Sequence, residues 1–361
     1  MRIGILTFHS VDNYGAVLQA YALQTYISSL GHEVEIIDYR PAYFHGRRKW
    51  SLRPGRLANN IASAMAERRF ESFRRDFMHR TAVCRNKKDL ASKLPVYDAV
   101  VVGSDQVWSP DVDRRKETDP IYFFDWDIPN KTRKIAYAAS FGTDEISERH
   151  REATSAGIKN VDFISVREPS GVRIVKQLSG HDAQWVCDPV FLLYVNEWCG
   201  RLGIDDDLPT GDEYVCYMPP SPDLIREFAA AEGRQIVCLG WNPVYALSMN
   251  LSCSIPTPRQ WIERISRAKG VITQSFHGTA FSIILHKPFV YVCPSGARKS
   301  RTTRITSLLD RLGLEGRMVW QEDADPERIS MLFSDQTDWK AVDEKLNEFR
   351  QESFRFLASN L

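Results

Sequence analysis

Five short polar clusters follow apolar runs of this chain, and their side chains could bind an anion or move a proton. They occupy residues 13–15, 103–106, 167–168, 188–189 and 275–278. In open α/β sheets, ligands bind at the carboxyl ends of the strands. A helix N-terminus offers free N–H groups to an anion, and glycine lets a ligand approach the backbone closely. Five clusters drawn from both halves of the chain indicate one shared cleft.

The candidate catalytic residues are Arg167, His277 and Asp105. The planar guanidinium of arginine suits bidentate binding of an oxyanion. A protonated histidine suits phosphate binding or proton delivery to a leaving group. Asp105 is the candidate base or acceptor ligand. The candidate substrate-binding residues come from the same clusters and from the basic string at 298–304, and they are Asn13, Gly15, Ser104, Ser275, Gly278, Lys299 and Arg304.

Each of these residues also has an ordinary structural interpretation. Asn13 could form an Asx-turn ahead of a helix, and Asp105 could cap a helix or a turn. Arg167 could pair with a neighbouring acid, and His277 could be a satisfied histidine at a strand end. For Asp188, which precedes a proline, we favour the start of a turn.

Several familiar catalytic motifs are missing from the sequence. It contains neither GxGxxG nor GxxxxGK[ST], which excludes the usual dinucleotide and Walker-type phosphate sites. It also lacks the GxSxG elbow and HExxH. The seven cysteines are scattered and form no CxxC. We therefore expect no metal site, no disulfide framework and a reducing compartment.

Composition describes an ordinary globular chain of 361 residues, with 43% hydrophobic and 26% charged residues. The net charge of +1 gives no reason to expect a nucleic-acid partner. No apolar run approaches the ~18 residues that a membrane span requires. A strand-like stretch follows Met1 directly, without the pattern of a signal peptide, so we expect a cytoplasmic protein.

Continuous apolar strands alternate with amphipathic helices, which predicts an α/β fold with parallel sheets covered on both faces. The pattern restarts after a loop-like stretch near 188–211, so we expect two Rossmann-like domains facing a cleft. We assign residues 1–190 to the N-terminal domain and residues 191–330 to the C-terminal domain. Residues 331–361 should end in a long helix that packs back on the N-terminal domain.

Residues 45–80 depart from this pattern and predict a basic helical insertion, with ten Arg and Lys against three acids. Two apolar sets recur at helical spacing, Leu57, Ile61 and Met65 and then Phe70, Phe73 and Phe77. One interpretation is a solvated helix whose apolar residues pack on the N-terminal domain. The other is a basic surface that meets an anionic membrane or a lipid-linked pyrophosphate.

Seven segments, in this order, resemble the polysaccharide pyruvyl transferase family. They read DNYGAVLQAYAL, GSDQVW, YAASFG, SVREPSG, CDPVFLL, SFHGTAFSIILHKPF and RITSLLDRLGL. The resemblance extends over residues 4–317. It implies a two-domain fold similar to GT-B glycosyltransferases, and transfer of the pyruvyl unit of phosphoenolpyruvate to a sugar as a cyclic ketal. It also implies a glycan acceptor of the cell surface, built on a lipid pyrophosphate at the inner membrane face.

By this resemblance, Arg167, His277 and Lys299 match positions that hold phosphoenolpyruvate. Many members carry arginine two residues before the histidine, where this chain has Ser275. One phosphate or carboxylate contact is then missing, or it comes from Lys299, Arg301 or Arg304. Phosphoenolpyruvate is expected as a donor substrate, with no cofactor and no metal. The alternatives are a GT-B glycosyltransferase that uses a nucleotide sugar and a non-catalytic glycan- or phosphate-binding protein.

Overall fold

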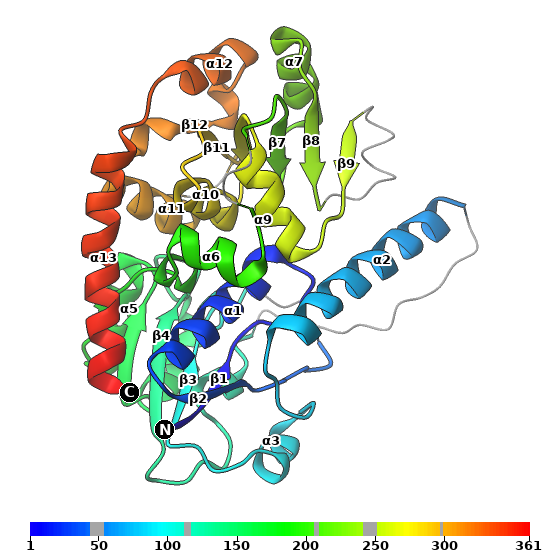
Figure 1. The fold of residues 1–361 in the computed structure, drawn as a ribbon. Coiled ribbons are helices and arrows are strands. Elements are labelled where there is room, and N and C mark those ends of the chain that lie inside the picture. Colours follow the sequence, from blue (N-terminus) through cyan, green and yellow to red (C-terminus); the bar gives the residue numbers. More distant parts are fainter. Residues whose placement is uncertain (44–53, 112–116, 206–208, 241–250, 297–298) are drawn as a thin grey trace.

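The computed structural model describes residues 1–361 except for 44–53, 112–116, 206–208, 241–250 and 297–298. The described residues form two six-stranded sheets with helices packed around them, one in the lower and one in the upper part of Figure 1. Every pairing between neighbouring strands is parallel. This architecture confirms the predicted α/β fold of two Rossmann-like domains.

The first sheet has the strand order β2-β1-β3-β4-β5-β6. Its strands are β1 (Arg2–Leu6), β2 (Glu33–Ile36), β3 (Ala99–Val102), β4 (Arg133–Ala139), β5 (Phe163–Val166) and β6 (Gln184–Trp185). The second sheet has the order β12-β11-β10-β7-β8-β9. Its strands are β7 (Tyr214–Tyr217), β8 (Ile236–Leu239), β9 (Ser252–Ser254), β10 (Gly270–Thr273), β11 (Phe289–Cys293) and β12 (Met318–Trp320). Strands with both faces covered are apolar throughout, as β3 and β7 are, because no side chain of theirs reaches water.

Helices connect these strands and cover the faces of the two sheets. Those of the first domain are α1 (Tyr14–Ser29), α2 (Pro54–Phe77), α3 (Lys87–Lys93), α4 (Glu148–Ile158) and α5 (Pro169–Ser179). Those that follow are α6 (Val195–Leu202), α7 (Pro222–Glu232), α9 (Pro258–Arg267), α10 (Phe276–Ile284), α11 (Lys299–Leu312), α12 (Pro326–Ser334) and α13 (Trp339–Asn360). Helix α10 begins two residues before Gly278, where the sequence predicted its start, because Ser275 caps it.

The two domains are joined by an apolar interface around α1. The first half of this helix is buried on all sides, because it packs on the first sheet and also against α9 and α10 of the second domain. Tyr14 stacks on Trp261 with ring centroids 5.3 Å apart, and the rings of Tyr21 and Trp198 have centroids 5.6 Å apart. One continuous apolar cluster therefore extends through both domains. It fixes the N-terminus of α1 against the N-terminus of α10.

Helix α2 carries the basic segment and extends away from the first sheet on the right of Figure 1. Its last turns pack on the domain, because Phe70 and Phe73 are buried in the core. In its earlier turns Ala62 is buried, whereas Ile61 and Met65 are 49% and 46% exposed. In the first apolar set predicted for this segment, Ile61 and Met65 thus face solvent and Leu57 is half-buried. The second set packs as the structural interpretation expects. Residues 44–53 of the segment lie outside the described residues.

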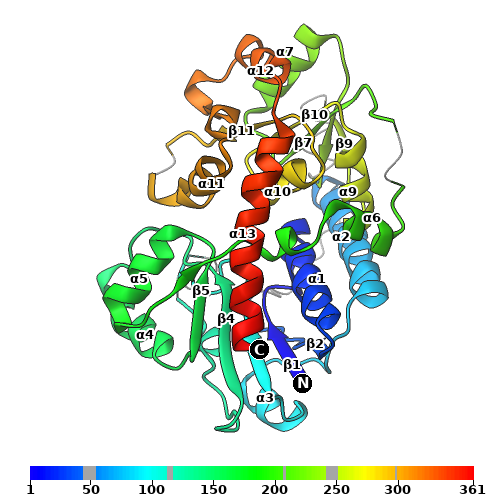
Figure 2. The same ribbon diagram turned by 60° about the vertical axis from the view of Figure 1, so that its left-hand side comes forward.

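The C-terminal helix α13 runs along both domains, as Figure 2 shows. Ser353 Oγ accepts the Cys187 N–H at 2.9 Å, and Arg350 Nε donates to the Phe191 carbonyl at 2.6 Å. At the end of the helix, Arg133 Nη1 donates to the Leu361 carbonyl at 2.6 Å. The helix therefore contacts the first sheet and the connection that leads to the second domain.

Candidate active site

Arg167 follows β5, and its guanidinium is buried between acids from two other strand ends. Nη1 donates to Asp188 Oδ2 at 2.7 Å, and Nη2 lies 3.4 Å from Asp105 Oδ1. The guanidinium carbon is 4.8 Å from the centroid of the Phe276 ring. Burial alone would lower the pKa of Arg167, but Asp188 and Asp105 raise it above its usual value. Arg167 is thus a fixed cation at the carboxyl edge of the first sheet.

Asp188 holds this arginine, and it also starts the turn that the sequence predicted. Its Oδ1 accepts the Val190 N–H at 3.1 Å and caps the short helix Pro189–Leu192. Its Oδ2 accepts from Arg167 and from Ser104 Oγ, and lies 3.7 Å from His277 Nε2. Burial would raise the pKa of Asp188, but His277 and Arg167 lower it well below its usual value. Sequence reasoning missed this second role, because the turn already accounted for an Asp-Pro pair.

His277 lies in the first turn of α10 and reaches the first domain. Its imidazole packs against Gly15, where an added Cβ would fall 2.0 Å from Nδ1. The side chain is buried, and Nε2 has no hydrogen-bond partner among the described residues. Buried polar atoms are nearly always paired in native proteins, so this nitrogen is available to an ordered water or to a bound ligand. His277 is placed to offer that nitrogen to a ligand.

Arg304 from α11 brings a second arginine to the same place. With the Gln106 amide oxygen turned towards it, Nη1 and Nη2 donate to that oxygen at 3.0 and 2.7 Å. Burial lowers the pKa of Arg304, and the charge of Arg167 lowers it further. Like-charged side chains repel one another in a buried site, and a bound anion would offset that repulsion. Burial raises the pKa of Glu168, and the charges of Arg167 and Arg304 act in the opposite direction. The Glu168 carboxylate offsets part of the positive charge of the two arginines.

Three nitrogen atoms of this cluster are buried without a hydrogen-bond partner within the described part of the chain. They are Arg167 Nε, His277 Nε2 and Arg304 Nε. Two come from charged guanidinium groups, for which an unmet hydrogen bond is costly. Arg167 follows β5 of the first domain, whereas His277 and Arg304 belong to α10 and α11 of the second. The arrangement therefore has the features of an anion site assembled at the domain interface.

The remaining predicted residues have mostly structural contacts. Asn13 Oδ1 accepts the Ala16 N–H at 3.1 Å, and Ser275 Oγ accepts the Gly278 N–H at 3.3 Å, so both cap helices. An added Cβ at Gly278 would lie 2.4 Å from Thr273 Oγ1. Gly15 and Gly278 are therefore required for packing within the protein. Close approach of a ligand to either residue stays a prediction.

Ser104 and Asp105 support the cluster from β3. Ser104 is fully buried, and its Oγ donates to Asp188 Oδ2 at 3.2 Å. Asp105 Oδ1 accepts the Gln106 N–H at 2.9 Å, and 19% of its side chain is exposed. A substrate contact of either residue stays a prediction. Lys299 is the first residue of α11, and its side chain lies outside what the structure describes.

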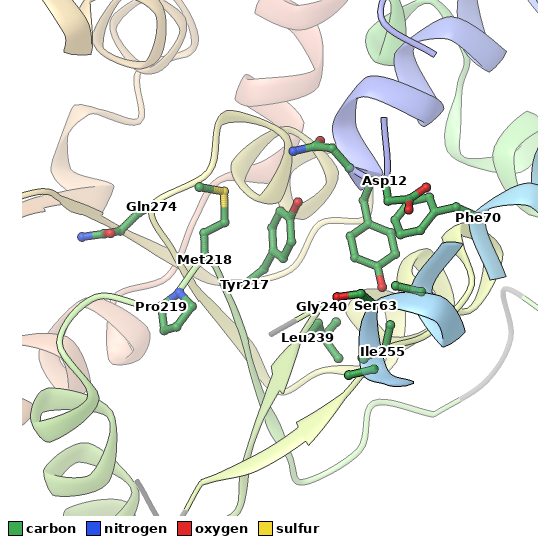
Figure 3. A pocket seen from close by; sticks show the side chains of 14 residues that line it. Asp12, Ser63, Phe70, Tyr217, Met218, Pro219, Leu239, Gly240, Ile255 and Gln274 are labelled. Atoms are coloured by element: carbon green, nitrogen blue, oxygen red, sulfur yellow. The ribbon is translucent and has the colours of Figure 1, made fainter. Parts of the chain in front are cut away.

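Two cavities open beside the cluster, each formed by both domains. The first, named here the aromatic cavity, has a volume of about 580 Å³ and is lined by Tyr14, Phe70, Tyr217 and Met218 among others (Figure 3). The second, the polar cavity, has a volume of about 1160 Å³ and lies between residues 143–150 of the first domain and Tyr291, Ser295 and Arg304, among others, of the second. Gln274 lines both cavities.

The cluster itself is closed off from these cavities except at one residue. Arg167 and His277 are 3% and 7% exposed and line neither cavity. Arg304 lines the polar cavity. Among the described residues, no group of three or more His, Cys, Asp or Glu side chains is arranged to hold a metal ion. The expectation that the reaction needs neither metal nor cofactor stays a prediction.

The family model for polysaccharide pyruvyl transferases matches residues 13–294, which include every residue of the cluster except Arg304. The chain belongs to this family. It is therefore a transferase, and the sequence-based resemblance is confirmed. No curated protein matches the chain significantly. In the part of the chain that the structure describes, no helix is both long and apolar enough to cross a membrane.

Solved structures share the fold of this pyruvyl transferase family member at low sequence identity. The putative UDP-N-acetylglucosamine 2-epimerase from Listeria monocytogenes is 10% identical, with a TM-score of 0.53 over 97% of this chain and 90% of that chain. The UDP-GlcNAc 2-epimerase from Neisseria meningitidis, bound to UDP-GlcNAc, is 11% identical, with a TM-score of 0.52 over 100% of both chains. At such identities the likeness concerns the fold alone. Together with the two parallel sheets, it confirms the GT-B-like architecture.

Proposed function

We propose that the protein transfers the pyruvyl group of phosphoenolpyruvate to a sugar of a cell-surface polysaccharide or of its lipid-linked precursor. The product is a pyruvate ketal, and phosphate is released. One observation carries this proposal beyond the family match. Arg167, His277 and Arg304 converge from both domains, and each leaves a buried nitrogen without a partner. A small donor with a phosphate and a carboxylate, and without a nucleotide, suits such a site.

The proposed reaction adds two sugar hydroxyls across C2 of the enol ester. The first hydroxyl forms a C–O bond to C2, and C3 gains a proton to become a methyl group. The bond from C2 to the phosphate oxygen then breaks, and C2 becomes cation-like. The second hydroxyl closes the ketal ring, and its proton leaves with the phosphate. No electron acceptor is needed, since the donor supplies the leaving group.

In this scheme the cationic residues at the site bind the donor. Arg167 and Arg304 bind the phosphate and carboxylate oxygens, with Lys299 as a third cation from the start of α11. In the free protein, the buried Nε atoms of both arginines lack a hydrogen-bond partner, which costs free energy. Binding the donor oxygens through these Nε atoms would remove that cost. Asp188 holds Arg167 and His277 in place through a single oxygen. These contacts would stabilise negative charge as it develops on the leaving phosphate.

His277 and Asp105 are the proposed proton-transfer groups. A protonated His277 Nε2 would donate to the phosphate, or deliver a proton as the phosphate leaves. Asp105 stands at the carboxyl end of β3 with its side chain partly exposed, and it is the candidate base or ligand for the acceptor. A positioned acid–base group contributes about 10²–10⁴-fold to rate. The scheme uses no metal and no cofactor.

The acceptor we propose is built on a lipid pyrophosphate at the inner membrane face, so the enzyme would work in the cytoplasm beside an anionic surface. The early turns of α2 support a peripheral contact, because exposed Ile61 and Met65 lie in the same helix as Arg68 and Arg69. Such a mixture of apolar and basic groups is typical of helices that lie in a membrane interface. Phe70 and Phe73 do not take part, because they are buried in the core.

Release of inorganic phosphate from phosphoenolpyruvate tests the proposed donor directly. We expect release that depends on the presence of an acceptor glycan and that is lost in His277→Ala. Transfer from a nucleotide sugar with no release from phosphoenolpyruvate would identify a glycosyltransferase instead. Binding of glycan or phosphate without turnover of either donor would identify a non-catalytic protein.

A further inference from the structure

The polar cavity is formed by groups that suit a sugar. The first domain contributes Thr143, Asp144 and Ser147, and the second contributes Tyr291 and Ser295. Hydroxyl, carboxylate and phenol groups of this kind form the hydrogen bonds that a polyol requires. The volume of about 1160 Å³ exceeds the range of about 300–1,000 Å³ that is usual for small-ligand sites. The cavity therefore has room for more than one sugar unit.

The aromatic cavity differs in both size and character. Phe70, Tyr217, Met218 and Leu239 form much of its wall, and its volume is about half as large, 580 against 1160 Å³. Figure 3 shows the Tyr217 and Phe70 rings at this wall, with Gln274 on the opposite side. Such a wall satisfies few of the hydroxyl groups of a sugar, and unmet polar groups weaken binding. Of the two cavities, the polar one suits a glycan.

The polar cavity also adjoins the anion site at Arg304. Arg304 lines this cavity, and its neighbour Thr303 donates to Asp144 Oδ2 at 2.8 Å across the domain interface. Asp144 Oδ1 is buried and has no partner among the described residues. A carboxylate oxygen accepts hydrogen bonds and can hold a hydroxyl group. The unpaired oxygen thus belongs to a carboxylate that is bonded to the residue next to Arg304, and both Asp144 and Arg304 line the polar cavity.

We propose that the polar cavity binds the acceptor glycan, with Asp144 Oδ1 accepting a hydrogen bond from a hydroxyl of the sugar that receives the ketal. This proposal rests on the function proposed above and specifies where its second substrate lies. A reacting hydroxyl held by Asp144 would stand beside Arg304 and so beside the donor. The aromatic cavity, on the other side of Gln274, would not take the glycan.

Two matched substitutions distinguish the cavities. Ser295 is an exposed residue that lines the polar cavity, and Met218 is 50% exposed and lines the aromatic cavity. Ser295→Trp and Met218→Trp each place a large side chain in one cavity without removing a core contact. The probe is the surface glycan of the producing cell, treated with mild acid to remove acid-labile ketals and so expose acceptor sites. Glycan binding is measured by affinity electrophoresis, and phosphoenolpyruvate binding by calorimetry.

We expect Ser295→Trp to weaken glycan binding about tenfold or more, and Met218→Trp to leave it unchanged. Asp144→Asn should weaken it similarly, since the loss of a hydrogen bond to a charged group has about this effect. Phosphoenolpyruvate affinity should stay the same in all three variants. Glycan binding that is unaffected by Ser295→Trp, or blocked by Met218→Trp, overturns the proposal. A wild-type protein that binds no glycan also overturns the proposal.

The two proposals fail in distinguishable ways. If phosphoenolpyruvate neither binds nor releases phosphate, the proposed donor is wrong. The electrophoresis still reports which cavity holds the glycan, because it requires no turnover. If phosphate is released but Ser295→Trp retains full activity and full glycan binding, the donor is supported and the acceptor site proposed here is wrong.

Discussion

The imidazole of His277 lies directly against Gly15, so that a Cβ added at position 15 would fall 2.0 Å from Nδ1. Gly15 belongs to the first turn of α1 and His277 to the first turn of α10, and the contact joins the two domains. No side chain fits at position 15 without displacing the imidazole or the helix. The position of the histidine is therefore set from the other domain.

Gly15→Ala should lower kcat by about 10²-fold, because a displacement of about 1 Å at a reacting group can cost that much. Gly200→Ala is the matched control, since Gly200 lies in helix α6 with nothing within 4 Å of an added Cβ. Phosphate release and circular dichroism measure activity and folding in parallel. Full activity in Gly15→Ala would show that the contact does not position His277.

His277→Ala should reduce turnover by about 10²–10⁴-fold and leave the fold intact. The control is His286→Ala, because His286 is partly exposed and pairs with Asp343 away from the site. Steady-state phosphate release compares the two variants with the wild type. A folded His277→Ala protein with wild-type turnover would return this residue to a purely structural role.

The arginines at the site should determine the affinity for the donor. Arg304→Ala and Lys299→Ala should each weaken phosphoenolpyruvate binding by about 1.5–3 kcal/mol, the usual contribution of a hydrogen bond to a charged group. Arg167→Lys should also bind poorly, because an ammonium cannot replace a planar guanidinium that contacts two acids. Arg149→Ala, an exposed change at the edge of the polar cavity, serves as the control. Calorimetry that finds unchanged affinity in the first three variants would contradict the anion site.

Asp188→Asn should lower the free energy of unfolding by about 3–5 kcal/mol, because it leaves the buried Arg167 without its closest counter-charge. The folded protein lowers the pKa of Asp188, so the ion pair stabilises fully above the ordinary value of about 3.9. Its contribution is then lost as the pH falls towards the lower folded value. The difference in unfolding free energy between the wild type and Asp188→Asn should therefore shrink by about 1.4 kcal/mol per pH unit below about pH 3.9.

Urea unfolding at a series of pH values measures this difference in unfolding free energy between the wild type and Asp188→Asn. Asp182→Asn is the control, because Asp182 forms an exposed pair with Lys176 and should contribute little. A gap between wild type and Asp188→Asn that stays constant down to about pH 3 would exclude a depressed pKa for Asp188.

The local sequence pattern was enough to predict the fold and the polar residues that follow apolar strands. The apolar strands before Arg167 and His277 predicted that each side chain would lie at the carboxyl end of a strand, where open α/β sheets bind ligands. Arg167 follows β5 of the first sheet, and His277 follows β10 of the second. The basic string near Arg304 was recognisable because it follows the strand after the histidine helix. These features depend on neighbours in sequence, which is why sequence alone could predict them.

Other features depend on contacts between distant segments, and sequence gave no sign of them. Asp188 caps a turn with one oxygen and pairs with Arg167 through the other, so the local pattern accounted for only half of its role. Gly15 is required by His277, more than 250 positions away in the chain and in the other domain. Asp144 lies in a loop without a motif, and only the fold brings it to Thr303.

The membrane contact proposed for α2 gives a further prediction. The wild-type protein should co-sediment with anionic liposomes at low salt, since each cation near the surface contributes about 1 kcal/mol. Added salt should weaken the binding. Charge reversal at Arg68 and Arg69, together with Arg47 and Arg48 outside the described residues, should release the protein. Activity on a short soluble acceptor should survive.

A matched reversal at Lys340 and Lys345, two exposed residues of α13, should leave liposome binding unchanged. If the wild type does not bind anionic liposomes at low salt, the exposed Ile61 and Met65 have no membrane role. The acceptor would then be sought among soluble sugars.

The mass of the product tests the central claim most directly. The purified protein is incubated with phosphoenolpyruvate labelled with ¹³C in its three carbons and with the acid-treated glycan, and the glycan is analysed by mass spectrometry. We predict that the acceptor gains one labelled pyruvate as a ketal, with equimolar release of phosphate and no gain in the His277→Ala variant. A glycan of unchanged mass, while a nucleotide sugar adds a sugar residue to it, would contradict the assignment of this chain as a pyruvyl transferase that uses phosphoenolpyruvate.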